Sequence, residues 1–129
     1  MDSRYPTTFS RAQFEEALGA AAARFDAAYA TDNDTEPFYI DPSGEEIQRL
    51  IRVYNEVTGE DRKPFTIGGG TYAREFKNAA AFGPEMPWRE DPAWVGPMHG
   101  DDEGVSEDLL KSALKIYILA IKELMEITY

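Results

Sequence analysis

The stretch "EDLLKSALKIYILAIKEL", residues 107–124, predicts a long amphipathic helix near the C-terminus. Ser106 precedes the stretch as a helix cap, and Glu107 and Asp108 lie in the first turn, where the helix dipole favours negative charge. The apolar residues recur at helical spacing and form one stripe, which consists of Leu110, Ala113, Tyr117, Ala120 and Leu124. This end of the chain is therefore predicted to be helical.

Two further helices are predicted upstream. A turn and helix-start signal at residues 41–44 comes before an apolar stripe that stops at Gly59, and the stripe consists of Ile47, Leu50, Ile51, Tyr54 and Val57. Ser10 and Gln13 have the spacing of a capping box, which predicts a helix over residues 10–23. A short helical turn is expected over residues 72–76.

Four short segments have the pattern of β-strands. Residues 2–6 are extended by Pro6, and residues 25–29 alternate between apolar and polar or small side chains. Residues 64–67 and 79–82 are short apolar runs of the kind found in buried strands. The first third of the chain is therefore expected to be β-α-β, and the whole chain is predicted to belong to the α/β class.

The composition excludes several classes of function. The 129 residues, 43% of them hydrophobic, suit one globular domain or pieces of two. A formal charge of -11, with no basic face, argues against a nucleic-acid partner. No apolar run is long enough to span a membrane, and the N-terminus has no signal-peptide pattern. The absence of cysteine excludes thiolate metal sites and fits a cytoplasmic protein.

The stretch "IGGGTYAR", residues 67–74, places three glycines between a predicted strand and a helical turn. Backbone N–H groups in such a loop can face an anion, but the glycines can also form a plain tight turn. The spacing matches neither the dinucleotide fingerprint nor the phosphate loop, so nucleotide binding is disfavoured. Thr71 can hydrogen-bond a substrate from the same loop.

Two more residues are candidates for a site. Arg4 on the first predicted strand can receive a carboxylate through its planar guanidinium, although an ordinary surface arginine is the simpler interpretation. His99 is the only histidine, and the carboxylates of residues 101–103 follow it in the long loop of residues 83–104. Imidazole suits zinc, but a closed zinc site takes three or more protein ligands, so His99 alone does not establish one.

A set of motifs in a fixed order indicates a family. The motifs are "DSRYP", "VYNEVTGE", "FTIGGGTYAR", "NAAAFGPEMP", the His99 segment and "DLLKSALKIYILAIKEL". In this order and spacing, the chain resembles the C-terminal portion of bacterial di-zinc dipeptidases of the Xaa-His dipeptidase and carnosinase type, within the aminoacylase and succinyl-diaminopimelate desuccinylase superfamily. The resemblance implies an α/β fragment in which residues 1–35 form half of a ferredoxin-like lid domain. Residues 36–129 would form the C-terminal strands and helices of the zinc-peptidase catalytic domain.

The resemblance also implies roles for single residues. Arg4 lies where the family has a lid arginine that grips the substrate's terminal carboxylate, and Gly69, Gly70 and Thr71 lie where a catalytic-domain loop helps to hold it. His99 lies where the family has its last zinc ligand, in a pattern that Asp102 and Glu103 complete. The family's other zinc ligands and its general base lie upstream, so no catalytic residue is expected in this segment. The chain alone is expected to bind neither zinc ion stably and to be inactive.

The expected partners follow from these assignments. The complete enzyme would hydrolyse dipeptides in the cytoplasm with two zinc ions. Half of a ferredoxin-like sheet would leave an open edge and an uncovered apolar face, so a homodimer or a domain-swapped assembly is expected. The alternative is a non-enzymatic or degenerate module that binds small carboxylates or another protein.

Overall fold

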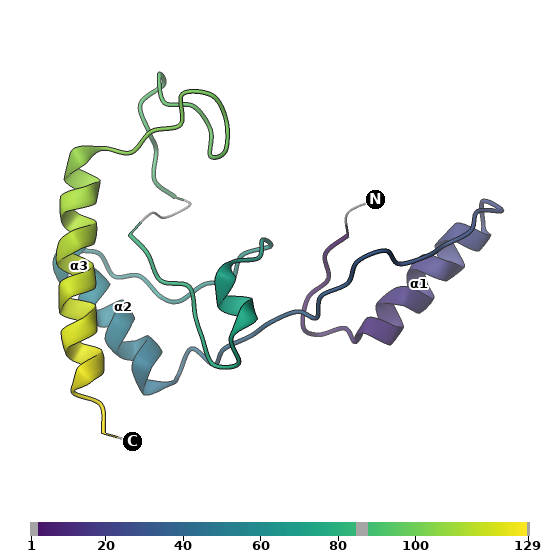
Figure 1. The fold of residues 1–129 in the computed structure, drawn as a ribbon, viewed down its shortest axis with the longest axis horizontal. Coiled ribbons are helices and arrows are strands. Elements are labelled where there is room, and N and C mark those ends of the chain that lie inside the picture. Colours follow the sequence, from purple (N-terminus) through teal and green to yellow (C-terminus); the bar gives the residue numbers. More distant parts are fainter. Residues whose placement is uncertain (1–2, 85–87, 129) are drawn as a thin grey trace.

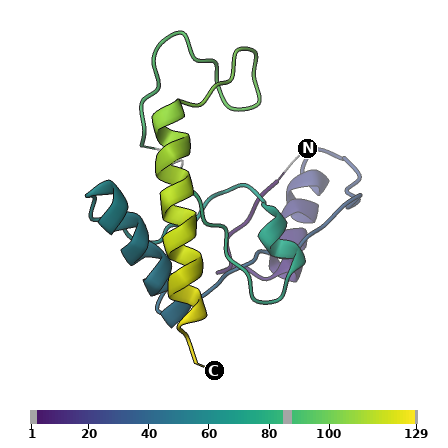
Figure 2. The ribbon, with the colours of Figure 1, turned by 60° about the vertical axis from the view of Figure 1, so that its left-hand side comes forward.

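The computed structural model describes residues 3–84 and 88–128, in which three α-helices and one short 3-10 helix are joined by long irregular segments (Figure 1). The elements in order are α1 (Arg11–Ala23), α2 (Glu45–Thr58), η1 (Tyr72–Glu75) and α3 (Glu107–Met125). Helices α2 and α3 pack against each other at one end of the molecule, and α1 lies at the other end (Figures 1 and 2). The proposed division of the chain at residue 35 stays a prediction.

Helix α2 begins and ends where the sequence predicts. Two acidic residues, Glu45 and Glu46, occupy its first turn, and Gly59 ends the helix at a φ of 73°. This left-handed conformation costs glycine little because it has no Cβ. Val53 and Tyr54 are the buried residues of α2, and Leu50, Ile51 and Val57 pack around them at the interface with α3. Four of the five residues of the predicted stripe, all but Ile47, thus belong to this core or pack against it, and Val53 joins them from outside the stripe.

Helix α3 forms as predicted, and its buried face matches the predicted stripe only in part, at Ala113 and Ala120. Ser106 caps the helix by accepting a hydrogen bond from the Leu109 N–H at 3.2 Å. Ala113, Ile116 and Ala120 are the buried residues, whereas Leu110 and Tyr117 of the predicted stripe are exposed. The reason is that α3 has apolar residues around most of its circumference, so the spacing alone could not tell which side meets α2.

Polar contacts hold the two helices in register at one end. The Arg49 Nη1 group donates to the backbone carbonyl of Glu123 at 3.0 Å, and the Arg52 Nη2 group lies 2.6 Å from the Glu123 carboxylate. These bonds are partly exposed and add little beside the apolar contact. Among residues 3–84 and 88–128, no helix is long and apolar enough to cross a membrane.

Helix α1 stands apart from the α2–α3 pair. Ser10 and Gln13 form the predicted capping box, with the side chain of each bonded to the backbone of the other. No residue of α1 is buried, although Phe14 stacks on Tyr5 with ring centroids 4.6 Å apart. Arg11 pairs with Asp34 at 2.9 Å, so the segments on both sides of α1 lie beside it.

The α/β prediction is wrong for the part of the chain that the structure describes. No strand forms over residues 3–6, 25–29, 64–67 or 79–82, and one isolated bridge joins Gly96 to Glu103. The fold is helical, so neither half a ferredoxin-like sheet nor catalytic-domain strands are present in these ranges. A strand is stabilised by a neighbour that pairs with its backbone, and these segments lack one. Asp2, the first residue of the first predicted strand, lies outside the described residues.

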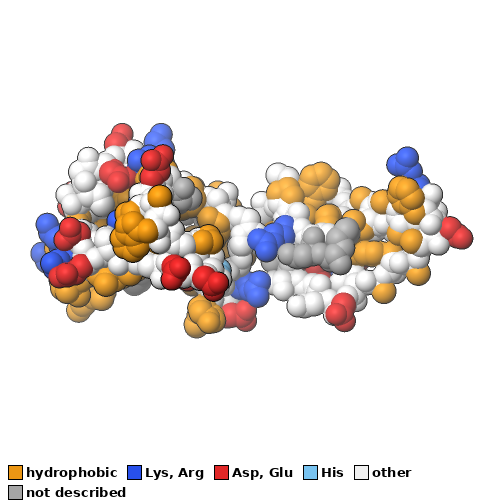
Figure 3. Space-filling model, turned by 90° about the horizontal axis from the view of Figure 1, so that it is seen from above, with side chains coloured by type: hydrophobic (Ala, Val, Ile, Leu, Met, Phe, Trp, Pro, Cys, Tyr) orange, Lys and Arg blue, Asp and Glu red, His pale blue; other side chains and the backbone are white. Residues whose placement is uncertain are grey.

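Much apolar surface remains in contact with solvent. The accessible surface is 10540 Å², whereas a compactly folded chain of this length exposes about 7,000 Å². Figure 3 shows hydrophobic side chains gathered on the surface of both ends of the molecule. The exposed apolar residues include Phe25 in the irregular part and Leu114, Ile118, Ile121 and Met125 along the outer side of α3. The α2–α3 pair is therefore the main core of the structure.

Candidate functional site

The segment that leads into the glycine loop, residues 68–70, is hydrogen-bonded to helix α2. The Asn55 side chain donates to the Arg62 carbonyl at 3.0 Å, and its oxygen accepts the Arg62 N–H at 2.8 Å. This two-way bond holds the backbone of residue 62 against the end of the helix. Helix α2, which belongs to the main core, therefore fixes the position of residue 62, and the chain runs from there to the glycines at residues 68–70.

Aromatic and charged side chains extend this anchor. The Arg62 guanidinium lies over the Trp88 ring at 4.3 Å, and Phe65 meets the same ring edge to face at 5.5 Å. Arg62 Nε also donates to the Glu60 carboxylate at 2.6 Å, and this bond is the main cause of the lowered pKa of Glu60. Trp88 thus packs against the segment before the glycines.

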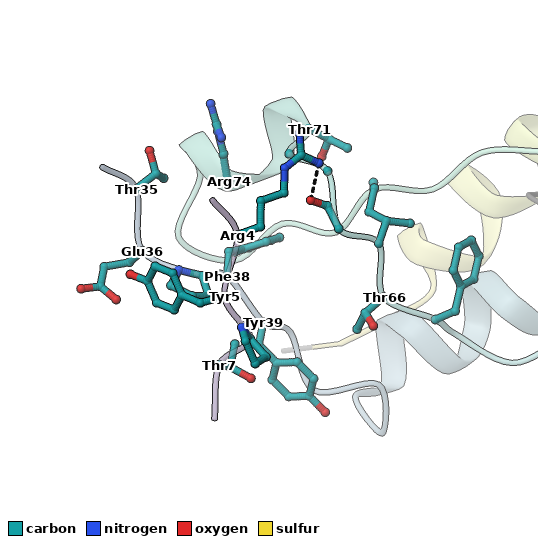
Figure 4. Close-up of a pocket in the computed structure, with 18 of the residues that line it drawn as sticks. Arg4, Tyr5, Thr7, Thr35, Glu36, Phe38, Tyr39, Thr66, Thr71 and Arg74 are labelled. Atoms are coloured by element: carbon teal, nitrogen blue, oxygen red, sulfur yellow. Dashed lines mark hydrogen bonds between the residues drawn. The ribbon is translucent and has the colours of Figure 1, made fainter. Parts of the chain in front are cut away.

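Arg4 reaches the glycine loop from the N-terminal part of the chain. Its Nη1 group donates to the Gly68 carbonyl at 2.6 Å, a contact between residues 64 positions apart (Figure 4). The same nitrogen would lie 3.9 Å from a Cβ at Gly69. The structure thus brings together Arg4 and the glycine loop, which the sequence proposed as parts of one site.

Thr71 lies at the end of this loop and caps the short helix η1. Its hydroxyl oxygen accepts the Ala73 N–H at 3.2 Å, which leaves the hydroxyl proton available to an acceptor. Figure 4 shows Thr71 beside the Arg4 guanidinium. Thr71 is exposed, as are the three glycines.

Arg74 is a member of this group that sequence reasoning missed. Its guanidinium folds back over Gly70, where an added Cβ would lie 2.6 Å from Nη1. Arg4 and Arg74 line the same broad surface pocket with the glycines and Thr71. The signal was present in the sequence, because the basic residue that ends "IGGGTYAR" lies one helical turn after the glycines.

Tyr5 forms an apolar wall beside the two arginines. Its ring stacks on Phe14, and its hydroxyl group makes no hydrogen bond with the described residues. Desolvation, followed by the negative charges of Glu36 and Asp34, raises the pKa of Tyr5 above its usual value. Figure 4 shows Tyr5 and Phe38 close together on the side of the pocket opposite Thr66. The pocket therefore combines cationic, hydroxyl and aromatic groups.

His99 lies in a different part of the molecule. Its backbone has a φ of 61°, and its N–H donates to the Glu103 carboxylate at 3.1 Å, which closes a tight turn. This turn lies beyond the N-terminal end of α3, away from η1 in both ribbon views (Figures 1 and 2). Within residues 3–84 and 88–128, no three His, Asp or Glu side chains are grouped so that they could hold a metal ion. The structure does not bring His99 to the glycine loop.

The chemistry open to this arrangement is anion binding. Two guanidinium groups beside exposed glycines and a hydroxyl can receive a carboxylate through charge-assisted hydrogen bonds. Such a local positive charge contrasts with the net charge of -11 on the whole chain. The site residues Arg4, Gly69, Gly70, Thr71 and His99 remain predictions as to their roles.

Comparison with known proteins gives one consistent result. The chain is 34% identical over 125 residues to a protein of Staphylococcus haemolyticus named "Putative dipeptidase". Proteins with the same description in Staphylococcus saprophyticus and Staphylococcus aureus are each 32% identical over 124 residues. No family model and no solved structure matches the chain. Each alignment covers 94% of this chain, which spans 25% of the length of the relatives it matches. Over nearly its whole length, the chain is therefore similar to about a quarter of these dipeptidase-named proteins.

Proposed function

We propose that this chain supplies the substrate-carboxylate end of a cytoplasmic, zinc-dependent dipeptidase of the Xaa-His dipeptidase type. The observation that carries the proposal is the 2.6 Å hydrogen bond from Arg4 to Gly68, which joins the two separate parts of the predicted carboxylate site. A dipeptide always ends in a carboxylate, and a planar guanidinium can bind it through two parallel bonds. The similarity to dipeptidase-named proteins supports the same reaction class.

The role of this part would be to hold the substrate in position. Arg4 would bind the terminal carboxylate, and the N–H groups of Gly69 and Gly70 with the Thr71 hydroxyl would fix its direction. Correct placement of the scissile bond contributes much of an enzyme's rate acceleration. The bound substrate has already lost the translational and rotational entropy that reactants free in solution must lose at the transition state. An aminopeptidase that cleaves long peptides does not need a pocket for the C-terminal carboxylate of its substrate so near the bond that it cleaves.

The described residues do not complete a zinc site, because no three His, Asp or Glu side chains among them are grouped so that they could hold a metal ion. We propose His99 as one ligand and place the remaining ligands in a part of a dipeptidase outside these 129 residues. Two bound zinc ions in such enzymes supply an activated water and polarise the scissile carbonyl. For this reason the chain alone should be inactive and should hold no zinc ion stably.

A hydrolysis assay with zinc or manganese tests the proposal. The isolated chain is compared with a joined protein, in which it replaces the matching quarter of the Staphylococcus haemolyticus relative. We expect no turnover by the chain alone and dipeptide hydrolysis by the joined protein. A joined protein that is folded and loaded with metal but inactive would contradict the dipeptidase proposal, and would favour a non-enzymatic carboxylate-binding module instead.

We also propose that two copies of the isolated chain associate through the outer side of α3. Leu110, Leu114, Tyr117 and Ile121 recur at spacings of four and three residues, which is the pattern of a helix-pairing seam. All four are exposed, and the surface exceeds that of a compact chain by about 3,500 Å². A stable dimer buries about 800 Å² from each partner, which is less than the excess surface of the whole chain.

Light scattering after size exclusion should therefore give twice the mass of one chain. Leu114→Glu places a charge in the middle of the seam and should return the chain to a monomer. Phe25→Glu alters an even more exposed apolar residue away from α3 and should leave the dimer intact. A monomeric unaltered chain, or a Leu114→Glu variant that stays dimeric, would contradict the proposed interface.

A further inference from the structure

The Arg74 guanidinium occupies a position that only a glycine permits. Its Nη1, Cζ and Cδ atoms would lie 2.6, 3.2 and 3.5 Å from a Cβ at Gly70. The side chain thus runs along the bare backbone of the loop, and any larger residue at position 70 would push it away. This close approach places the guanidinium next to the backbone that precedes Thr71.

The two arginines approach the loop from different parts of the chain. Arg4 comes from the N-terminal segment and meets Gly68 and Gly69, whereas Arg74 comes from η1 and covers Gly70. Figure 4 shows the Arg4 guanidinium beside Thr71 and the Arg74 side chain extending from η1. The two guanidinium groups therefore lie along the same three glycines, Gly68 to Gly70.

We propose that Arg74 is a second carboxylate-binding residue, which acts with Arg4 and Thr71 on the terminal carboxylate of a dipeptide. This inference rests on the proposed function and adds a residue to its site. Arg74 pairs with Glu75 through Nε at 3.4 Å, so its terminal nitrogens can still donate to a ligand. The hydroxyl proton of Thr71 supplies a third donor, since its oxygen already accepts the Ala73 N–H.

The chain itself provides the test. The backbone amide signals of the chain are followed by NMR while glycylglycine is added, and the titration is repeated with glycylglycinamide, which lacks the carboxylate. We expect glycylglycine to shift the signals of residues 68–74 and the amide to leave them in place. Arg74→Gln should weaken glycylglycine binding about tenfold, since it removes a charge-assisted pair of donors. Arg74→Lys should bind glycylglycine more tightly than Arg74→Gln, because it keeps the positive charge, but less tightly than the unaltered chain, because it lacks the two parallel N–H donors of a guanidinium.

Arg24→Gln is the matched control, because Arg24 is an exposed arginine at the end of α1. It should bind glycylglycine as the unaltered chain does. If Arg4→Gln weakens binding but Arg74→Gln does not, the inference about Arg74 is overturned and the proposed carboxylate site stands. If glycylglycine and its amide give the same shifts in the unaltered chain, the carboxylate site itself is overturned, and the role of Arg74 with it.

Discussion

Replacing His99 by alanine in the joined protein is expected to lower dipeptide hydrolysis more than about 100-fold and to release one of two zinc ions. Loss of a residue that only hydrogen-bonds to a metal ligand already lowers metal affinity or activity by about 10- to 100-fold, so loss of a ligand itself should lower them further. His99 is exposed and lies in a turn closed by its own backbone N–H, which does not depend on the imidazole. The substitution should therefore leave the fold unchanged.

The measurements are the metal content of the purified protein and its kcat at saturating metal. Met98→Ala is the matched control, because Met98 precedes His99 in the same loop and is 64% exposed. This variant should keep both ions and nearly full activity. A His99→Ala protein that retains two ions and its activity would remove His99 from the metal site.

Ile116→Ala is expected to lower the free energy of unfolding of the α2–α3 pair by about 3 kcal/mol. Ile116 has an exposed fraction of 0% and lies in the cluster with Val53, Tyr54 and Ala120. Truncation removes apolar contacts and leaves a cavity in a core of few residues. Since small cores are only marginally stable, this one change should unfold the pair at a much lower temperature.

Ile118→Ala gives a matched comparison on the same helix. Ile118 is 59% exposed on the outer side of α3, so the same truncation should change the free energy of unfolding by less than about 0.5 kcal/mol. Thermal unfolding of both variants, followed by circular dichroism at one low chain concentration, measures the difference. Equal losses at the two positions would show that α3 does not pack on α2 through Ile116.

The helices could be predicted because their signals are local. Ser10, Ser106 and Gly59 each act on a neighbouring turn of the backbone, and all three end or begin helices in the structure. The packing face of α3 was predicted only in part, since apolar residues surround the helix and the choice depends on α2. Leu110 is exposed although it belongs to the predicted stripe, and Ile116 is buried although it does not.

The strands were predicted wrongly because a strand is not a local structure. The run of residues 64–67 has apolar side chains of the right kind, but its backbone finds no neighbour, and Phe65 packs on Trp88 instead. The pairing of Arg4 with the glycine loop was predicted from the family resemblance, because the local pattern of the glycines left a plain turn and an anion site both open. Arg74 was missed because its position over Gly70 depends on how the chain turns after the loop.

Arg4 and the glycine loop are proposed to recognise the carboxylate of a dipeptide. The most direct test compares kcat/KM of the joined protein for a dipeptide and for the same dipeptide with an amidated C-terminus, before and after Arg4→Gln. We predict that the joined protein prefers the free acid by about 100-fold, and that Arg4→Gln removes most of this preference. An equal preference in both proteins would contradict the account, because the carboxylate would then be recognised elsewhere.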